Sequence, residues 1–189
     1  MAFRRPSDRT YNVVELYEYA VGALGRRMRS VAEMKRLMRQ KVRKQEDGEV
    51  LVNAVVEKLK EQKYLNDSQY AASYSSYRKE NEKFGRMRVV TDLKIKGVHA
   101  DVIESTVSAA YEGVNEEELA RAYLRRKRID KKPANEKEAA RVFRTLARGG
   151  FPSRTIVRIL KNWDVDDETV TALETGADER EPAADGEQE

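Results

Sequence analysis

The fold of this chain is decided by residues 65–98, which read LNDSQYAASYSSYRKENEKFGRMRVVTDLKIKGV. The segment begins with an apolar residue followed by polar residues that favour a helix start (65–67, LND), and it ends with a glycine hinge (96–98, KGV). Matching starts occur at 114–116 (VNE) and 165–167 (VDD), at successive spacings of 49 and 51 residues. A matching hinge occurs at 149–151 (GGF). A period near 50 residues predicts a repeated structural unit.

Apolar residues recur with the 3.6-residue period of a helix in almost every segment. Ser30 and Glu33 are spaced as a capping box, in which each side chain satisfies a backbone amide of the first helical turn. We therefore expect an all-α protein whose tandem repeats of three-helix units form an elongated, curved array. The expected boundaries are an N-terminal extension at 1–12, three-helix repeats at 13–64, 65–113 and 114–165, and a short helical remnant with an acidic, disordered tail at 166–189.

The net charge of +4 conceals an uneven distribution. Residues 174–189 hold seven acidic residues against one basic residue, so the 173 residues before them carry a net charge of +10. A basic body with an acidic end predicts a polyanionic partner or an acidic protein surface, and charge alone does not choose between the two. No run approaches the roughly 18 apolar residues of a membrane helix, and residues 1–6 lack a signal peptide's apolar stretch. We expect a cytoplasmic monomer that makes no membrane contact.

Composition removes several kinds of chemistry. The chain has no cysteine, so a disulfide framework, a cysteine-based zinc site and a thiol nucleophile are excluded. The one histidine, His99, follows a glycine hinge at an expected helix N-cap, which favours a capping or surface role over a catalytic one. The acidic run at 166–168 is typical of a solvated helix N-terminus. We expect no catalytic residues, no metal and no cofactor.

Two basic runs stand out. Residues 26–44 hold nine basic residues against Glu33, and residues 121–132 hold seven against Asp130. Each run goes largely unneutralised by its own acids, which predicts a basic stripe, although a solvated helix face is the ordinary alternative for any single residue. Tyr70, Tyr74 and Tyr77 lie on one helix face, where we expect core packing with hydroxyls at the rim rather than stacking on bases.

Residues 65–98 resemble the central motif of the RecX family of regulatory proteins. The match rests on LND at 65–67, YA at 70–71, Arg78, GRMRV at 85–89, DL at 92–93 and KGV at 96–98. Residues 24–37 are similar to the family's first repeat motif, and residues 143–160 fit its looser C-terminal repeat, so the likeness covers about residues 12–165. The charged link at 43–49 is longer than the family pattern leads us to expect, and the acidic tail lies outside it.

The resemblance implies a regulatory protein that binds the RecA recombinase, chiefly its filament on single-stranded DNA, and mostly inhibits it in recombination, DNA repair and the SOS response. It implies binding without turnover, with direct contact to single- or double-stranded DNA left open. Within the matched motifs, the candidate partner-binding residues are Arg26, Arg27, Arg29, Arg86, Arg88, Lys94 and Lys96.

Two alternatives remain open at this stage. Three short helices per unit also suit a helix-turn-helix-like protein that acts on DNA directly, although no helix carries a clear set of Asn, Gln and Arg for reading bases. A nucleic-acid enzyme would need a metal-binding carboxylate cluster, and the sequence does not place one.

Overall fold

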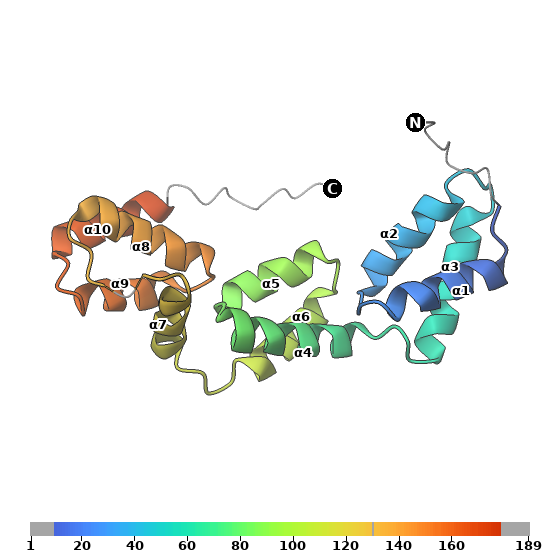
Figure 1. Ribbon diagram of the computed structural model, residues 1–189, viewed down its shortest axis with the longest axis horizontal. Coiled ribbons are helices and arrows are strands. Elements are labelled where there is room, and N and C mark those ends of the chain that lie inside the picture. Colours follow the sequence, from blue (N-terminus) through green and yellow to red (C-terminus); the bar gives the residue numbers. More distant parts are fainter. Residues whose placement is uncertain (1–9, 130, 179–189) are drawn as a thin grey trace. The chain divides into compact units, whose positions relative to one another are not determined.

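A computed structural model describes residues 10–129 and 131–178, and within them every regular element is helical. This confirms the all-α expectation, and Figure 1 shows the helices in chain order. The acidic tail from residue 179 and most of the expected N-terminal extension lie outside the described residues. The elements are α1 (Val13–Leu24), α2 (Val31–Val42), α3 (Gly48–Glu61), α4 (Asp67–Tyr77), the π-helical segment η1 (Arg78–Glu82), α5 (Arg86–Ile95), α6 (Ala100–Ala110), α7 (Glu116–Arg126), α8 (Glu136–Arg148), α9 (Ser153–Lys161) and α10 (Asp167–Asp178).

The chain forms two compact units, and the division between them falls within α4, α5 and α6. Unit 1 comprises residues up to 74 together with 92–108. Unit 2 comprises residues 75–91 together with those from 109 onward. The middle three-helix segment therefore contributes residues to both units.

The core of unit 1 lies among α1, α2 and α3 (Figure 1). Leu16, Met34, Met38 and Leu59 are fully buried there. Burial of each such side chain contributes roughly 1.5–3 kcal/mol to stability. The Ser30 capping box is present as predicted, and a second box begins α1 at Asn12. Gln45, in the long charged link, bonds both the amide and the carbonyl of Tyr11, so this link fastens the start of α1.

The core of unit 2 is built from α7, α8, α9 and α10. Leu146, Ile156, Ile159 and Leu160 are fully buried in it. An aromatic series adds to this core, since the ring centroids of Phe84 and Tyr123 lie 5.9 Å apart and those of Tyr123 and Phe151 lie 5.7 Å apart. The last helix, α10, packs against α8 and α9 and includes residues 174–178, so the acidic stretch begins inside a helix.

Five helix ends in the described residues share one pattern. After each helix one residue adopts a left-handed backbone, and the amide of the next residue donates to the carbonyl of a buried leucine five positions earlier, which satisfies an acceptor that the helix leaves open. The accepting leucines and their donors are Leu59 with Tyr64, Leu93 with Val98, Leu124 with Ile129, Leu146 with Phe151, and Leu160 with Val165. The left-handed residues are Lys63, Gly97, Arg128, Gly150 and Asp164. The hinges predicted at 96–98 and 149–151 are thus confirmed.

The start of α2 docks on the hinge between α5 and α6, entirely within unit 1. The Ser30 hydroxyl donates to the Lys96 carbonyl at 2.6 Å. Gly97 has φ +74°, and a Cβ added to it would lie 2.5 Å from the Cβ of Ala32. Only glycine satisfies both the backbone angle and the close approach. We call this contact the Gly97 joint.

The start of α5 docks on the hinge between α8 and α9 in the same manner, within unit 2. The amides of Gly85 and Met87 donate to the carbonyls of Gly149 and Gly150, at 2.8 and 3.2 Å. The first amides of a helix have no partner inside the helix, so these carbonyls cap α5. We call this contact the Gly150 joint.

Candidate functional site

The seven candidate residues fall into both units. Unit 1 holds five of them, because Arg26, Arg27 and Arg29 lie between α1 and α2 while Lys94 and Lys96 lie at the end of α5. Unit 2 holds Arg86 and Arg88, in the first turn of α5. Within unit 1 the structure brings Arg27 and Lys96 together around Glu33, since both favour its ionised form.

Glu33 is the centre of the unit 1 arrangement. Burial opposes its ionisation, but hydrogen bonding from the Ser30 amide and the positive charges of Lys96 and Arg27 outweigh that effect and hold the pKa of Glu33 below its ordinary value. Its carboxylate lies 3.4 Å from the Lys96 ammonium and accepts a 3.4 Å hydrogen bond from the Tyr70 hydroxyl. Glu33 therefore binds a cation and a phenol while it caps α2.

Lys96 is a packing residue as well as a candidate contact. Its side chain is only 24% exposed, and its ammonium lies 5.2 Å from the centroid of the Tyr74 ring as well as beside Glu33. Lys94, two residues earlier, is exposed. Of the two lysines, Lys94 presents the more accessible charge to a partner.

The expectation of core packing for the tyrosine stripe of α4 holds for two of its three members. Tyr70 and Tyr74 stack with centroids 6.0 Å apart, and their hydroxyls donate to Glu33 and to Asp92 at the rim. These two side chains follow the prediction of core packing. Tyr77 does not, because it is 56% exposed.

In unit 2, positive charge gathers around Tyr123. The Lys127 ammonium lies 5.4 Å from the centre of its ring, and Arg88 lies 5.8 Å from the neighbouring ring of Phe84. Burial raises the pKa of Tyr123, while Arg88 and Arg148 act to lower it. Arg88, Lys127 and Arg148, all exposed, form a basic surface over a buried aromatic core, which we call the Tyr123 surface.

The sequence-based candidates include Arg88 and omit the other two members of the Tyr123 surface. Lys127 belongs to the second basic run. Its position four residues after Tyr123, one helical turn away, is the sequence signal that could have identified it. Arg148 comes from α8, and only the packing of α8 against α7 brings it near Tyr123. The position of Arg88 depends on the Gly150 joint, since a Cβ on Gly150 would lie 2.2 Å from the Arg88 amide nitrogen.

Ion pairs with acids outside the two basic runs reduce the basic stripe that those runs predict. Arg121 pairs with Glu117 at 2.9 Å, Arg126 with Glu82 at 3.1 Å, and Lys132 with Asp164 at 3.2 Å. In the first run, Arg39 donates to Glu49 at 2.9 Å. Each acidic partner lies outside the run that it neutralises, either one helical turn away or on another element, so counting charges inside the runs missed them.

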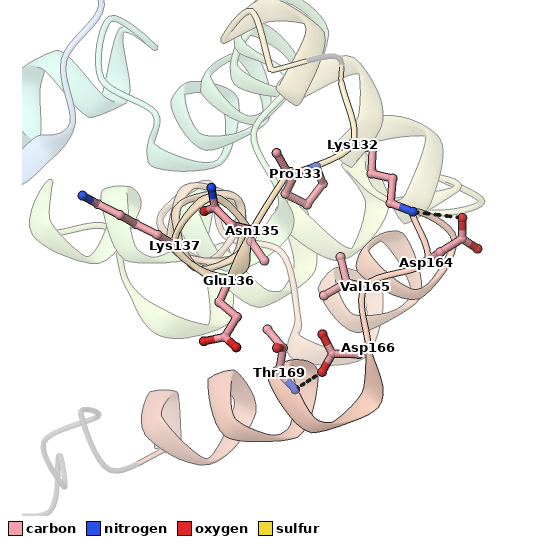
Figure 2. Close-up of a pocket in the computed structure, with 11 residues that line it drawn as sticks. Lys132, Pro133, Asn135, Glu136, Lys137, Asp164, Val165, Asp166 and Thr169 are labelled. Atoms are coloured by element: carbon pink, nitrogen blue, oxygen red, sulfur yellow. Dashed lines mark hydrogen bonds and ion pairs between the residues drawn. The ribbon is translucent and has the colours of Figure 1, made fainter.

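Unit 2 also contains a hollow of about 630 Å³ at the start of α8, shown in Figure 2. Lys132 and Asp164 form an ion pair on one side of it, and Asp166 accepts a 2.7 Å hydrogen bond from the Thr169 amide on the other. This hydrogen bond holds the pKa of Asp166 below its ordinary value. Lys132 and Asp164 neutralise one another and Asp166 caps α10, and none of the residues that line the hollow belongs to the Tyr123 surface.

The described residues contain no group of three or more His, Cys, Asp and Glu side chains placed to hold a metal ion. His99 lies at the N-cap of α6, is 76% exposed, and has its Nδ1 3.4 Å from an Asp101 oxygen. None of the helices in residues 10–129 and 131–178 is both long enough and apolar enough to cross a membrane.

Comparison with known proteins gives a consistent family. Residues 66–107 match the family model described as RecX, second three-helix domain. The chain is 30% identical to the regulatory protein RecX of Bacillus velezensis over 163 residues, which are 86% of this chain and 60% of that relative. It is 30% identical to the regulatory protein RecX of Chromobacterium violaceum over 122 residues, which are 64% of this chain and 75% of that relative.

Coverage of the relatives differs. The chain spans 60% of the Bacillus velezensis relative and 54% of the one from Bacillus pumilus, but 95% of the one from Pseudomonas syringae pv. tomato, to which it is 29% identical. The crystal structure of RecX from Lactobacillus salivarius superimposes with a TM-score of 0.61 at 20% identity, covering 80% of this chain and 96% of that one. That likeness supports the helical repeat architecture. With two relatives at 30% identity and a matching model of the middle repeat, the chain belongs to the RecX family of regulatory proteins.

Proposed function

We propose that this protein binds the RecA recombinase, chiefly as the filament that RecA forms on single-stranded DNA, and that it mostly inhibits RecA activity by binding alone, without turnover and as a monomer. The observation that carries the proposal is membership of the RecX family. The physical support is the placement of exposed basic residues beside rigid backbone joints, since Arg88 sits at the Gly150 joint and Arg27 near the Gly97 joint.

Basic surfaces suit a nucleoprotein filament because the filament is negatively charged. A nucleoprotein filament carries DNA phosphates and is therefore attractive to Arg and Lys at a distance. The Tyr123 surface combines Arg88, Lys127 and Arg148 above a buried aromatic core, so its charges are carried on a well-packed part of unit 2. Such an arrangement keeps its geometry when it meets a partner, which reduces the entropy lost on binding.

The test is fluorescence anisotropy of the labelled chain against three targets: free RecA, RecA filament on single-stranded DNA, and bare DNA, each at low and moderate salt. We expect tighter binding to the filament than to either component, and this preference should survive added salt. Strand-exchange and ATPase assays should then show inhibition that depends on the ratio of this protein to RecA. The amount of intact protein should stay constant during the reaction.

Direct action on DNA is the competing function, favoured by the exposed Arg and Lys of the two basic runs. It predicts tight binding to bare DNA with no gain from RecA. For about five phosphate contacts on duplex DNA, log affinity would then fall against log salt with a slope near −4.5. That result would overturn the proposal. Cleavage of DNA on addition of magnesium or manganese would contradict the proposed lack of turnover.

A further inference from the structure

Unit 1 contains a second hollow, of about 290 Å³, that none of the contacts described above fills. It lies between the end of α1, the following loop and the turn that connects α3 to α4. Two large apolar side chains flank it in solvent, because Met28 is 51% exposed and Tyr64 is 54% exposed. We call this hollow the Met28–Tyr64 pocket. Exposed apolar side chains beside a recess are typical of a surface that a partner covers.

The pocket is held in shape by backbone interactions. Lys63 adopts the left-handed conformation with φ +61°, although it is not glycine. The Tyr64 amide donates to the Leu59 carbonyl at 2.9 Å, which fixes the direction in which the chain leaves α3. The buried Tyr70 lines the pocket as well, and its hydroxyl is bonded to Glu33. A recess with walls set in this way loses little conformational freedom when a partner enters.

Arg29 supplies unused hydrogen-bond donors in this pocket. It is half-buried, and its Nε is out of contact with water and has no hydrogen-bond partner. Within the described part of the chain, no acidic side chain pairs with the Arg29 guanidinium. A guanidinium without an anionic partner is a favourable binding site for a carboxylate, which the terminal nitrogens of Arg29 would bind.

The surroundings select the chemistry of the occupant. The exposed Lys63 lines the pocket and the exposed Arg26 follows its lining residue Gly25, and neither base has an acidic partner in the described residues. The walls include the aliphatic side chains of Val21, Leu24 and Met28. A phosphate backbone makes no use of an aliphatic recess, whereas a protein segment with an acidic residue beside an aliphatic one fits both features.

We propose that the Met28–Tyr64 pocket docks a protein segment of the recombinase that carries a carboxylate next to an aliphatic side chain. The carboxylate binds Arg29, and the aliphatic side chain enters the recess between Met28 and Tyr64. This inference rests on the proposed function, since it assigns one of the surfaces through which the filament is bound.

Because the chain has no cysteine, a single introduced cysteine gives a unique attachment point. A Met28→Cys variant carrying a benzophenone maleimide is irradiated with the RecA filament, and a Val50→Cys variant is the control because Val50 is a 71% exposed apolar residue on α3, outside the pocket. We expect position 28 to crosslink to the recombinase at an acid-containing peptide, well above the level of the control. Crosslinking to DNA, or yield no greater than that of the control, would overturn the proposal.

Affinity measurements separate this proposal from the proposed function. Arg29→Gln and Met28→Ser should each weaken filament binding at least fivefold while leaving bare-DNA binding unchanged. The matched controls, Arg36→Gln on α2 and Val50→Ser on α3, should bind the filament as the unaltered chain does. If the unaltered chain binds the filament and all four variants bind equally, the pocket proposal fails alone. If the unaltered chain does not bind the filament, both proposals fail. Equal loss of filament and DNA binding would assign the pocket to nucleic acid.

Discussion

Gly150 lies so close to Arg88 that a Cβ added to the glycine would be 2.2 Å from the arginine's amide nitrogen. The same glycine has φ +84° and its carbonyl accepts a hydrogen bond from the amide of Met87. A candidate partner-binding arginine is thus set in place by a glycine 62 positions farther along the chain. The contact depends on backbone approach, which gives the first prediction.

Gly150→Ala should destabilise the protein by more than the roughly 1–2 kcal/mol that a left-handed alanine costs, because the Gly150 joint must also open to admit the methyl group. Gly113→Ala is the matched control, since Gly113 has φ +66° but nothing within 4 Å of its added Cβ. Urea unfolding of both variants measures the difference. Equal losses would show that the close approach to Arg88 does not constrain the fold.

Arg128→Gly should stabilise the protein by about 0.5–1 kcal/mol, because Arg128 has φ +58° and glycine adopts that conformation without a Cβ penalty. Arg125→Gly, three residues earlier and inside α7, should instead destabilise by about 1 kcal/mol. Thermal unfolding of the two variants checks this reversal of sign. Destabilisation by both would mean that the Arg128 side chain contributes more than its backbone strain costs.

Glu33 should make unfolding free energy depend on pH in the acid range. Its folded-state pKa lies below the ordinary value of 4.5, so its contribution is complete above pH 4.5 and is lost as the pH falls through the folded pKa. Glu33→Gln should cost about 1 kcal/mol near pH 6.5, because glutamine can keep the capping hydrogen bond but loses the attraction to Lys96 and Arg27. This deficit should shrink near pH 3.5. Glu57→Gln, which removes a solvent-exposed ion pair with Lys60, should cost little at either pH. A deficit independent of pH would refute the role given to the Glu33 carboxylate.

Lys94→Ala and Lys96→Ala should separate binding from packing. Lys96→Ala removes the half-buried contacts with Glu33 and Tyr74, so we expect a loss of about 1 kcal/mol in unfolding free energy. Lys94→Ala should leave stability unchanged and weaken filament binding about threefold, which is about 0.7 kcal/mol. Chemical unfolding and filament anisotropy on both variants test this. A stable Lys96→Ala variant would contradict the packing role.

We expect removal of the acidic tail to strengthen binding to bare DNA at low salt, on the hypothesis that its negative charge competes with DNA for the basic residues. The cut belongs after Asp178, since Val170 is buried in the unit 2 core and α10 continues to that residue. A chain of residues 1–178 loses five acidic residues and one basic residue. We expect a several-fold gain in affinity at low salt that fades as salt screens the charges. Unchanged DNA affinity would refute the competition.

The Ser30 cap and the hinges at Gly97 and Gly150 could be predicted because each depends on residues close in sequence. The left-handed turns at Lys63, Arg128 and Asp164 could not, since nothing in those side chains distinguishes them from helical residues. Their common signal is a leucine five positions before an apolar residue, which becomes informative once the same spacing is seen at several helix ends.

The π-helical segment at Arg78–Glu82 could not be predicted from the sequence either. It ends at Lys83, with φ +58°. Two contacts at the end of α6 hold this region: the Lys79 ammonium donates to the Ala110 carbonyl at 2.7 Å, and the Tyr111 hydroxyl donates to the Phe84 carbonyl at 2.8 Å. The wider turn therefore depends on tertiary contacts. Part of the candidate site could not be predicted for the same reason, because only the packed fold places Arg148 beside Tyr123 and Glu82 beside Arg126.

The Gly150 joint is made by main-chain atoms, so its integrity can be followed without altering any side chain. The amide protons of Gly85 and Met87 are held by carbonyls of the α8–α9 hinge and not by their own helix. Their exchange with solvent deuterium therefore times the opening of the joint itself. A partner that wedges α5 away from the hinge would speed exchange at these two amides, and one that clamps the two together would slow it.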